Sequence, residues 1–279
     1  MSSFDRYSRG VKTSDSIRAI VGDFLDVEAL RAAVRGQQQI YHFLSSTTPA
    51  TAESDPRIDL ATNVAGAIDL FSIAADEGVE RVAFASSGGA IYGDQAVIPI
   101  TEDAVPRPVS PYAIGKLAIE SYLRYFQRTR GLRSVSFRIS NPYGPNQAVA
   151  SKQGVIPIFL RAIAAGRPVT VFGDGSMVRD YLYVDDAAVM VAATADAHPQ
   201  SDVYNIGSGR GTSVTELLEL ARQVTGEVVD VEYRPQPATF VGRSIVDSTR
   251  FRSEFGLTPQ VDLEAGLQST WRALHGGGR

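Results

Sequence analysis

The sequence predicts an α/β protein in which a doubly wound parallel sheet is followed by a smaller mixed α/β lobe. In the first half, short apolar runs alternate with amphipathic stretches of helix length, a pattern typical of parallel strands joined by crossover helices. The sequence pattern changes at Asn141, where a run rich in proline and glycine begins. We therefore assign residues 1–145 to the sheet domain and residues 146–279 mainly to the second lobe, with later segments returning to the sheet.

Individual elements follow from local patterns. The apolar run 18–21 predicts a strand, and Asp26 is a suitable N-cap for a helix that ends at Val34. Pro111 is expected in the first turn of a helix that continues to Arg130. Further strands are predicted at 39–43, 81–85, 134–139, 169–172 and 203–206. Further helices are predicted at 58–77, 156–165, 186–196, 213–224 and 264–274, and a loop at 141–145.

Composition argues against several classes of protein. The 279 residues are 44% hydrophobic, which is enough for a large core, and the formal net charge of −4 comes without a basic stripe for nucleic acid. There is no cysteine, which removes disulfides and thiolate chemistry and is compatible with the cytoplasm. No stretch approaches ~18 consecutive apolar residues, and the N-terminus lacks a secretory apolar region, so we expect neither a membrane span nor export. Three scattered histidines (His42, His198 and His275) predict no metal site.

The strongest local feature is the pair Tyr112 and Lys116. Residues four apart share a helix face, and an ammonium beside a phenol favours the phenolate, which would make Tyr112 a base near neutral pH. Many helices carry this spacing by chance, so the pair alone favours no function. Its context does, because the polar glycine loop 86–89 ends the preceding buried strand, where open sheets bind ligands.

Several motifs in a fixed order resemble the extended short-chain dehydrogenase/reductase family, in particular its nucleotide-sugar epimerases and dehydratases. The motifs are SS with YG at 86–93, SPYA with Lys at 110–116, N.YGP at 141–145, GDG with RDY.YVDD at 173–186, and YNIGSG at 204–209. The resemblance runs from about Asp5 to Gly266. It implies a Rossmann-like sheet, NAD as cofactor and a nucleotide-sugar substrate.

The resemblance also implies roles for residues of the sheet domain. Tyr112 is the implied catalytic base, and Lys116 is the residue that bonds the nicotinamide ribose and lowers the pKa of the tyrosine. The family's loop hydroxyl falls at Gly88, so Ser87 can replace it only if the glycines let the loop shift. The implied NAD contacts are Asp5 at the adenosine ribose, Asp23 and Phe24 at the adenine, Phe43, Leu44, Ser45, Asn63 and Pro142, together with Tyr112 and Lys116.

On the substrate side, the resemblance implies contacts to the nucleotide sugar. Asn141 and Arg179 match positions at the diphosphate, and an arginine fork suits two phosphate oxygens. Val155, Thr170 and Phe172 match the wall of the base pocket. Without the resemblance, Arg179 would be interpreted as an ion-pair partner of Asp180, and Phe172 as a core aromatic residue.

Two departures from the family bear on function. Residues 88–90 offer no acid or base, which disfavours dehydration and decarboxylation and leaves epimerisation ahead. The family's first strand, its G-x-x-G-x-x-G turn and the following helix have no counterpart in this sequence, although such a turn binds the NAD pyrophosphate. We therefore expect an N-terminally truncated sheet that binds NAD poorly.

Together these observations predict an NAD-dependent epimerase that acts on a nucleotide-activated sugar by transient hydride transfer. Two alternatives stay open: a one-way NAD-dependent dehydrogenase or reductase on a similar substrate, and an inactive truncated homologue. The resemblance suggests a homodimer whose contact includes the Tyr112 helix. We expect no nucleic-acid or membrane partner and a cytoplasmic location.

Overall fold

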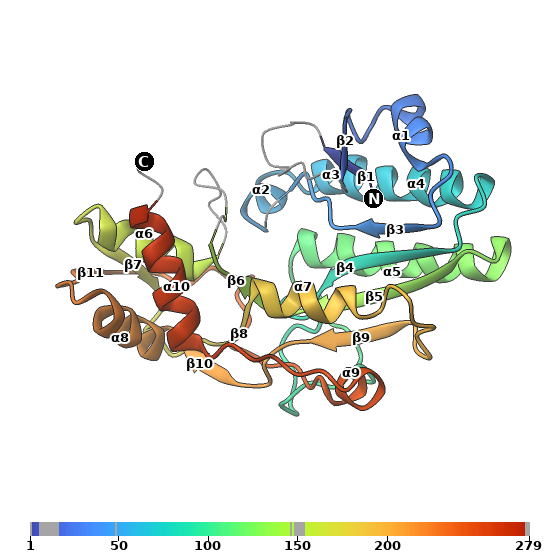
Figure 1. Cartoon of the computed structure of the whole chain (residues 1–279). Helices are drawn as coiled ribbons and strands as arrows, with labels where there is room; N and C mark the ends of the chain where they lie inside the picture. Colours follow the sequence, from blue (N-terminus) through green and yellow to red (C-terminus); the bar gives the residue numbers. More distant parts are fainter. Residues whose placement is uncertain (1, 6–16, 48, 146, 148–153, 277–279) are drawn as a thin grey trace.

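The computed structural model describes residues 2–5, 17–47, 49–145, 147 and 154–276 (Figure 1). Within these residues the central sheet has the strand order β3-β4-β5-β9, and all neighbouring strands are parallel. Its strands are β3 (Gln39–His42), β4 (Arg81–Ser87), β5 (Arg133–Ile139) and β9 (Val203–Ile206). The predicted parallel α/β architecture is confirmed, and β9 belongs to this sheet although it lies late in the chain.

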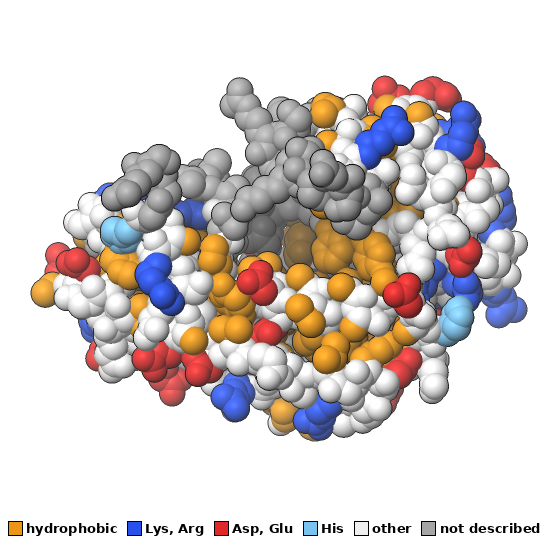
Figure 2. Space-filling model, in the orientation of Figure 1, with side chains coloured by type: hydrophobic (Ala, Val, Ile, Leu, Met, Phe, Trp, Pro, Cys, Tyr) orange, Lys and Arg blue, Asp and Glu red, His pale blue; other side chains and the backbone are white. Residues whose placement is uncertain are grey.

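Helices cover both faces of the central sheet. One face packs on α1 (Val27–Val34), α4 (Ala65–Asp76) and α5 (Pro111–Arg130), and the other on α7 (Val184–Ala192) and α9 (Thr249–Phe255). Successive residues of a strand point to opposite faces, so Phe84 enters the first core while its neighbour Ala83 enters the second. Figure 2 shows apolar side chains at the surface in the middle of this face of the molecule.

The first described strands form a separate pair. β1 (Ser2–Asp5) lies parallel to β2 (Arg18–Val21), and among the described strands neither is hydrogen-bonded to the central sheet. The prediction for α1 is confirmed at its start, because the Asp26 side chain accepts hydrogen bonds from the backbone N–H groups of Glu28 and Ala29.

The predicted helix 58–77 is a composite. It consists of α3 (Pro56–Asp59), one π-helical turn η2 (Leu60–Val64) and α4, and a short helix α2 (Pro49–Ser54) precedes it. By length and composition, the span from Pro56 to Asp76 is apolar enough to cross a membrane. However, 50% of its most apolar window is buried, and its inward residues belong to the core around Phe71, as expected of a core helix.

The second lobe has its own core and its own strands. β7 (Val169–Phe172) pairs with β11 (Val231–Arg234), while β8 (Val178–Tyr183) pairs with β6 (Asn141–Tyr143), β10 (Gly211–Ser213) and β12 (Arg243–Ser244). Three helices pack around this core: α6 (Val155–Ala164), α8 (Val214–Thr225) and α10 (Leu263–Gly276). The loop prediction at 141–145 is wrong for its first three residues, because they pair with β8, a strand that the sequence reading did not identify.

Candidate active site

The start of α5 places two side chains over the carboxyl end of β4. Ser110 caps the helix by accepting from Ala113 N at 3.3 Å, and Pro111 occupies the first turn. Lys116 Nζ donates to Ala85 O at 2.8 Å and lies 5.7 Å from the centre of the Tyr112 ring.

Ser87, the last residue of β4, supplies the third group of this site. Its hydroxyl acts on the Tyr112 phenol and opposes the rise in the Tyr112 pKa, because it stabilises the ionised form. The structure therefore brings Ser87, Tyr112 and Lys116 together, as the sequence predicted.

The pKa values of Tyr112 and Lys116 differ from the expectation. The pKa of Tyr112 is raised to about 12, chiefly by burial and then by the carboxylate of Asp59, against a smaller lowering by Ser87. Burial lowers the pKa of Lys116 to about 8, and Asp59 and Glu120 oppose that effect. The expected lowering of the Tyr112 pKa by Lys116 is wrong for this arrangement, since burial and Asp59 determine its direction.

Gly88 explains why the usual loop hydroxyl is absent. Its N–H donates to Ile139 O at 2.7 Å, and a Cβ at this position would lie 2.7 Å from Arg138 O and 2.9 Å from a Val246 methyl. Because the Arg138 carbonyl is part of the backbone and cannot move aside, a residue with a Cβ does not fit at position 88. The hydroxyl that faces Tyr112 is instead that of Ser87, one residue earlier.

A buried polar network lies behind these residues. Glu120, one helical turn beyond Lys116, accepts from Ser86 Oγ at 2.6 Å and from Arg138 at 3.1 and 2.7 Å. Arg138 also donates to Tyr92 OH at 3.0 Å, and Tyr92 donates to Asn205 Oδ1 at 2.7 Å. The network therefore ties α5, the end of β4 and β9 to one another. Its members were not identified from the sequence.

Apart from Tyr112 and Lys116, the predicted cofactor contacts lie in three places: at the ends of β1 and β2, on β6, and after β3. Gly22 N donates to Asp5 O at 3.0 Å, which sets Asp5 beside Asp23 and Phe24. The Phe24 ring is buried and stacks on His42 at 5.4 Å between ring centres, so this ring is part of the core. Pro142 is exposed on β6.

The third group of predicted cofactor contacts follows β3. Phe43 is exposed, Leu44 is half-buried, and Ser45 Oγ donates to Thr47 O at 2.9 Å. Asn63, buried in η2, fixes this loop because its Oδ1 accepts from Ser46 N at 2.8 Å. Asn63 of η2 therefore fixes the conformation of the loop that follows β3.

The two polar residues predicted for the diphosphate lie on neighbouring strands. Asn141 on β6 donates through Nδ2 to Asp180 O at 2.9 Å. Arg179 on β8 donates to Val178 O at 2.9 Å, and within the described residues it forms no ion pair with Asp180. Asp180 accepts instead from Ser208 and other groups of the turn after β9. Arg179 is half-buried, and burial lowers the pKa of its guanidinium.

The three residues predicted for the base pocket belong to α6 and β7. Val155 and Thr170 are half-buried, whereas the Phe172 ring is 37% exposed and is not a core aromatic residue. Phe240 packs edge-on against Phe172, with 5.7 Å between ring centres. Sequence reasoning did not identify Phe240, which lies 68 positions further along the chain and meets Phe172 only in the fold.

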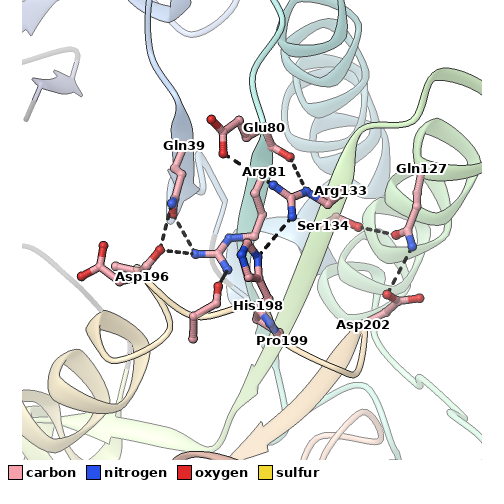
Figure 3. Close-up of a pocket in the computed structure, with 12 residues that line it drawn as sticks. Gln39, Glu80, Arg81, Gln127, Arg133, Ser134, Asp196, His198, Pro199 and Asp202 are labelled. Atoms are coloured by element: carbon pink, nitrogen blue, oxygen red, sulfur yellow. Dashed lines mark hydrogen bonds and ion pairs between the residues drawn. The ribbon is translucent and has the colours of Figure 1, made fainter.

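A polar cavity of about 250 Å³ lies at the opposite, amino edge of the central sheet (Figure 3). Arg81 at its centre donates to the backbone oxygens of Thr194, Ala195 and Ala197, and it thereby holds the chain after α7 to the sheet. Arg133 contacts His198 at 3.3 Å in the same cavity. Since none of the predicted site residues lines this cavity, we interpret the cluster as structural.

Comparison with known proteins gives a consistent result. The profile of the NAD dependent epimerase/dehydratase family matches residues 2–207. The UDP-glucose 4-epimerase of Mycolicibacterium smegmatis is 33% identical over 260 residues, which cover 93% of this chain and 83% of that protein. The dTDP-4-dehydro-6-deoxyglucose reductase of Escherichia coli is 30% identical, with 84% of this chain and 74% of that protein covered.

Solved structures agree with this assignment. The UDP-glucose 4-epimerase of Thermotoga maritima with UDP-glucose superposes with a TM-score of 0.93 at 32% identity, covering 100% of this chain and 91% of that one. The Thermus thermophilus UDP-glucose 4-epimerase in complex with NAD gives 0.91 at 30% identity, covering 99% and 91%. From its motifs, its fold and these matches, the chain belongs to the NAD dependent epimerase/dehydratase family.

Proposed function

We propose that this protein is an enzyme that epimerises a nucleotide-activated sugar with NAD as cofactor. The observation that carries the proposal is the arrangement of Ser87, Tyr112 and Lys116 at the carboxyl end of β4. Relatives of this chain include UDP-glucose 4-epimerases, which makes UDP-glucose and UDP-galactose the first substrates to test.

The residues of the site fit a dinucleotide. Asp5 ends β1 and Asp23 lies two residues beyond the end of β2, positions from which carboxylates accept from ribose hydroxyls. At the other end, the buried ammonium of Lys116 makes a single described hydrogen bond, to Ala85 O, so further N–H groups are available for a polar ligand. Bound NAD supplies the hydride acceptor.

During this reaction the protein's own side chains accept and return one proton. Tyr112 takes the proton of the sugar hydroxyl as the carbonyl forms, and it returns the proton when the sugar presents its other face. A phenol whose pKa is raised to about 12 is a strong base once ionised, and the Ser87 hydroxyl stabilises that ionised form.

On the substrate side, Arg179 and Asn141 are proposed to hold the diphosphate, and Phe172 with Phe240 the base. Support comes from the half-buried Arg179, which forms no ion pair within 4.0 Å among the described residues, and from the edge-to-face pair of exposed Phe172 with half-buried Phe240. A partly buried arginine without an ion-pair partner favours an anionic ligand.

Turnover of UDP-galactose or UDP-glucose, followed by NMR of the sugar proton at the epimerised carbon, tests the proposal. We expect Tyr112→Phe to lower kcat by roughly 10²–10⁴, the usual contribution of a general base. Tyr233→Phe, at an exposed tyrosine of β11 to which no role is assigned, is the matched control. Equal rates in wild type and Tyr112→Phe would refute the role of Tyr112.

The same assay separates the alternatives. A one-way dehydrogenase or reductase would change the NADH concentration in step with product, whereas an epimerase returns the cofactor to its starting state. Absence of turnover together with absence of NAD binding would identify an inactive homologue.

We also propose a homodimer through α5. On this helix Ile114, Tyr122 and Tyr125 are exposed, and Leu60 is exposed on the adjacent η2. An exposed row of large apolar side chains on packed helices favours association with a second copy. Light scattering measures the mass directly, and fractionation of cells would test the cytoplasmic location that we propose from the composition.

A further inference from the structure

One buried carboxylate beside the catalytic residues has no role in the mechanism above. Asp59, at the end of α3, is 2% exposed. Its Oδ1 accepts from Thr47 Oγ1 at 2.5 Å and from Asn63 Nδ2 at 2.8 Å. No lysine or arginine of the described residues forms an ion pair with it within 4.0 Å. A buried carboxylate without a cationic partner is costly, so its presence needs a reason.

The other oxygen of Asp59 faces the catalytic helix. A Cβ built at Gly115 of α5 would overlap Asp59 Oδ2, so only glycine admits the carboxylate at this position. Gly115 lies directly before Lys116 and three residues after Tyr112. A glycine inside a helix costs about 1 kcal/mol relative to alanine, and here that cost coincides with a close approach by a charged group.

The other charged groups around Lys116 are already neutral or paired. His42 on β3 is held neutral, because burial and then Lys116 lower its pKa to about 3. Glu120 on α5 is paired with Arg138 at 2.7 Å. Around Asp59 itself, Arg57 of the same helix contacts Asp55 at 3.3 Å, and the hydrogen-bond partners Thr47 and Asn63 carry no charge. Among the described residues, the negative charges that act on Lys116 are therefore Asp59, which has no ion-pair partner, and Glu120, which has one.

We propose that Asp59 is a positioning residue of the catalytic site: seated against Gly115, its carboxylate holds Lys116 as an ammonium ion. This inference deepens the proposed function and rests on it. The direction of the charge effects agrees, since Asp59 opposes the lowering of the Lys116 pKa by burial and adds to the raised pKa of Tyr112. Without the carboxylate, burial alone would favour a neutral amine at Lys116.

The test can be made without any enzyme assay, because the sequence has only three lysines, Lys12, Lys116 and Lys152. Exchanging Lys12 and Lys152 for arginine leaves one lysine, whose side-chain ¹³Cε resonance reports its titration by NMR. In this background Asp59→Asn keeps an oxygen for Asn63 and Thr47 but removes the charge. We expect the pKa of Lys116 to fall by roughly one unit.

Thr47→Val is the matched control. It removes a hydrogen bond to Asp59 and leaves the charge, so we expect a lower melting temperature but the same Lys116 pKa. If Asp59→Asn does not fold, Asp59→Ser is a second neutral variant with an oxygen near Asn63. A folded neutral variant in which the Lys116 pKa is unchanged would overturn the proposal, whether or not the enzyme turns over.

In the active enzyme the pH profile gives a second readout. Loss of the carboxylate lowers the pKa of both Tyr112 and Lys116, so both limbs of the kcat/KM profile should move to lower pH by a similar amount. A purely structural role would lower activity at every pH without this shift, and that outcome would also overturn the proposal. If the wild type shows no epimerase activity, the proposed function fails, and the NMR titration still decides the effect of Asp59.

Discussion

The buried ion pair between Glu120 and Arg138 gives a prediction that depends on no ligand. Their side chains are 0% and 5% exposed, and Arg138 Nη2 lies 2.7 Å from Glu120 Oε2. Removing one partner leaves the other charge buried and unpaired, which costs about 3–5 kcal/mol. Since 1 kcal/mol changes the melting temperature of a protein of this size by about 2–4 °C, Glu120→Leu should lower it by roughly 6–20 °C.

A double-mutant cycle measured by urea unfolding separates the charge from the packing. We expect Glu120→Leu and Arg138→Met each to be strongly destabilising, and the double variant to be much less destabilised than the sum of the two. Coupling arises because the second change removes the charge that the first left unpaired. Strictly additive losses, or a single-variant loss below about 1 kcal/mol, would refute the reasoning.

Two further predictions concern His42 and Arg179. His42 has its pKa lowered to about 3 in the folded protein, so the stability from its neutral ring is present above its ordinary pKa of 6.5 and is lost as pH falls towards 3. His42→Phe should therefore reduce the stability lost between pH 7 and pH 4 by roughly 3 kcal/mol, and parallel curves for the two proteins would contradict this. Arg179→Ala should raise KM for the nucleotide sugar by roughly 10–100-fold with a smaller effect on kcat, against exposed Arg272→Ala as control. An unchanged KM would remove Arg179 from the site.

Elements with local signals could be predicted closely. α5 has the predicted bounds because Ser110 and Pro111 start it, and Gly131 ends it in the left-handed conformation. β7 and β9 coincide with their apolar runs. In contrast, β6 and β8 could not be predicted. They form strands because they pair with each other, and the paired residues lie 40 positions apart, beyond the reach of any local sequence pattern.

The residues of the site also divide into those that the sequence could predict and those that it could not. Spacing and the resemblance suffice to place Tyr112 and Lys116 together, and Ser87 could be named as the substitute for Gly88. Asp59 could not be identified, since it reaches Gly115 only through the packing of α3 on α5. Burial sets the direction of the Tyr112 pKa, and burial at a single residue cannot be inferred from spacing.

The return of β9 to the central sheet has a consequence for how this protein can be divided. A fragment that stops at residue 145 would leave β5 as a bare edge strand, a known risk for aggregation, and would strip Tyr92 of its acceptor Asn205. A chimera that exchanges everything after residue 146 for the corresponding part of a relative would replace one strand of the catalytic sheet as well. New substrate specificity is therefore easier to graft through segments confined to the second lobe, such as those that carry Phe172 and Phe240.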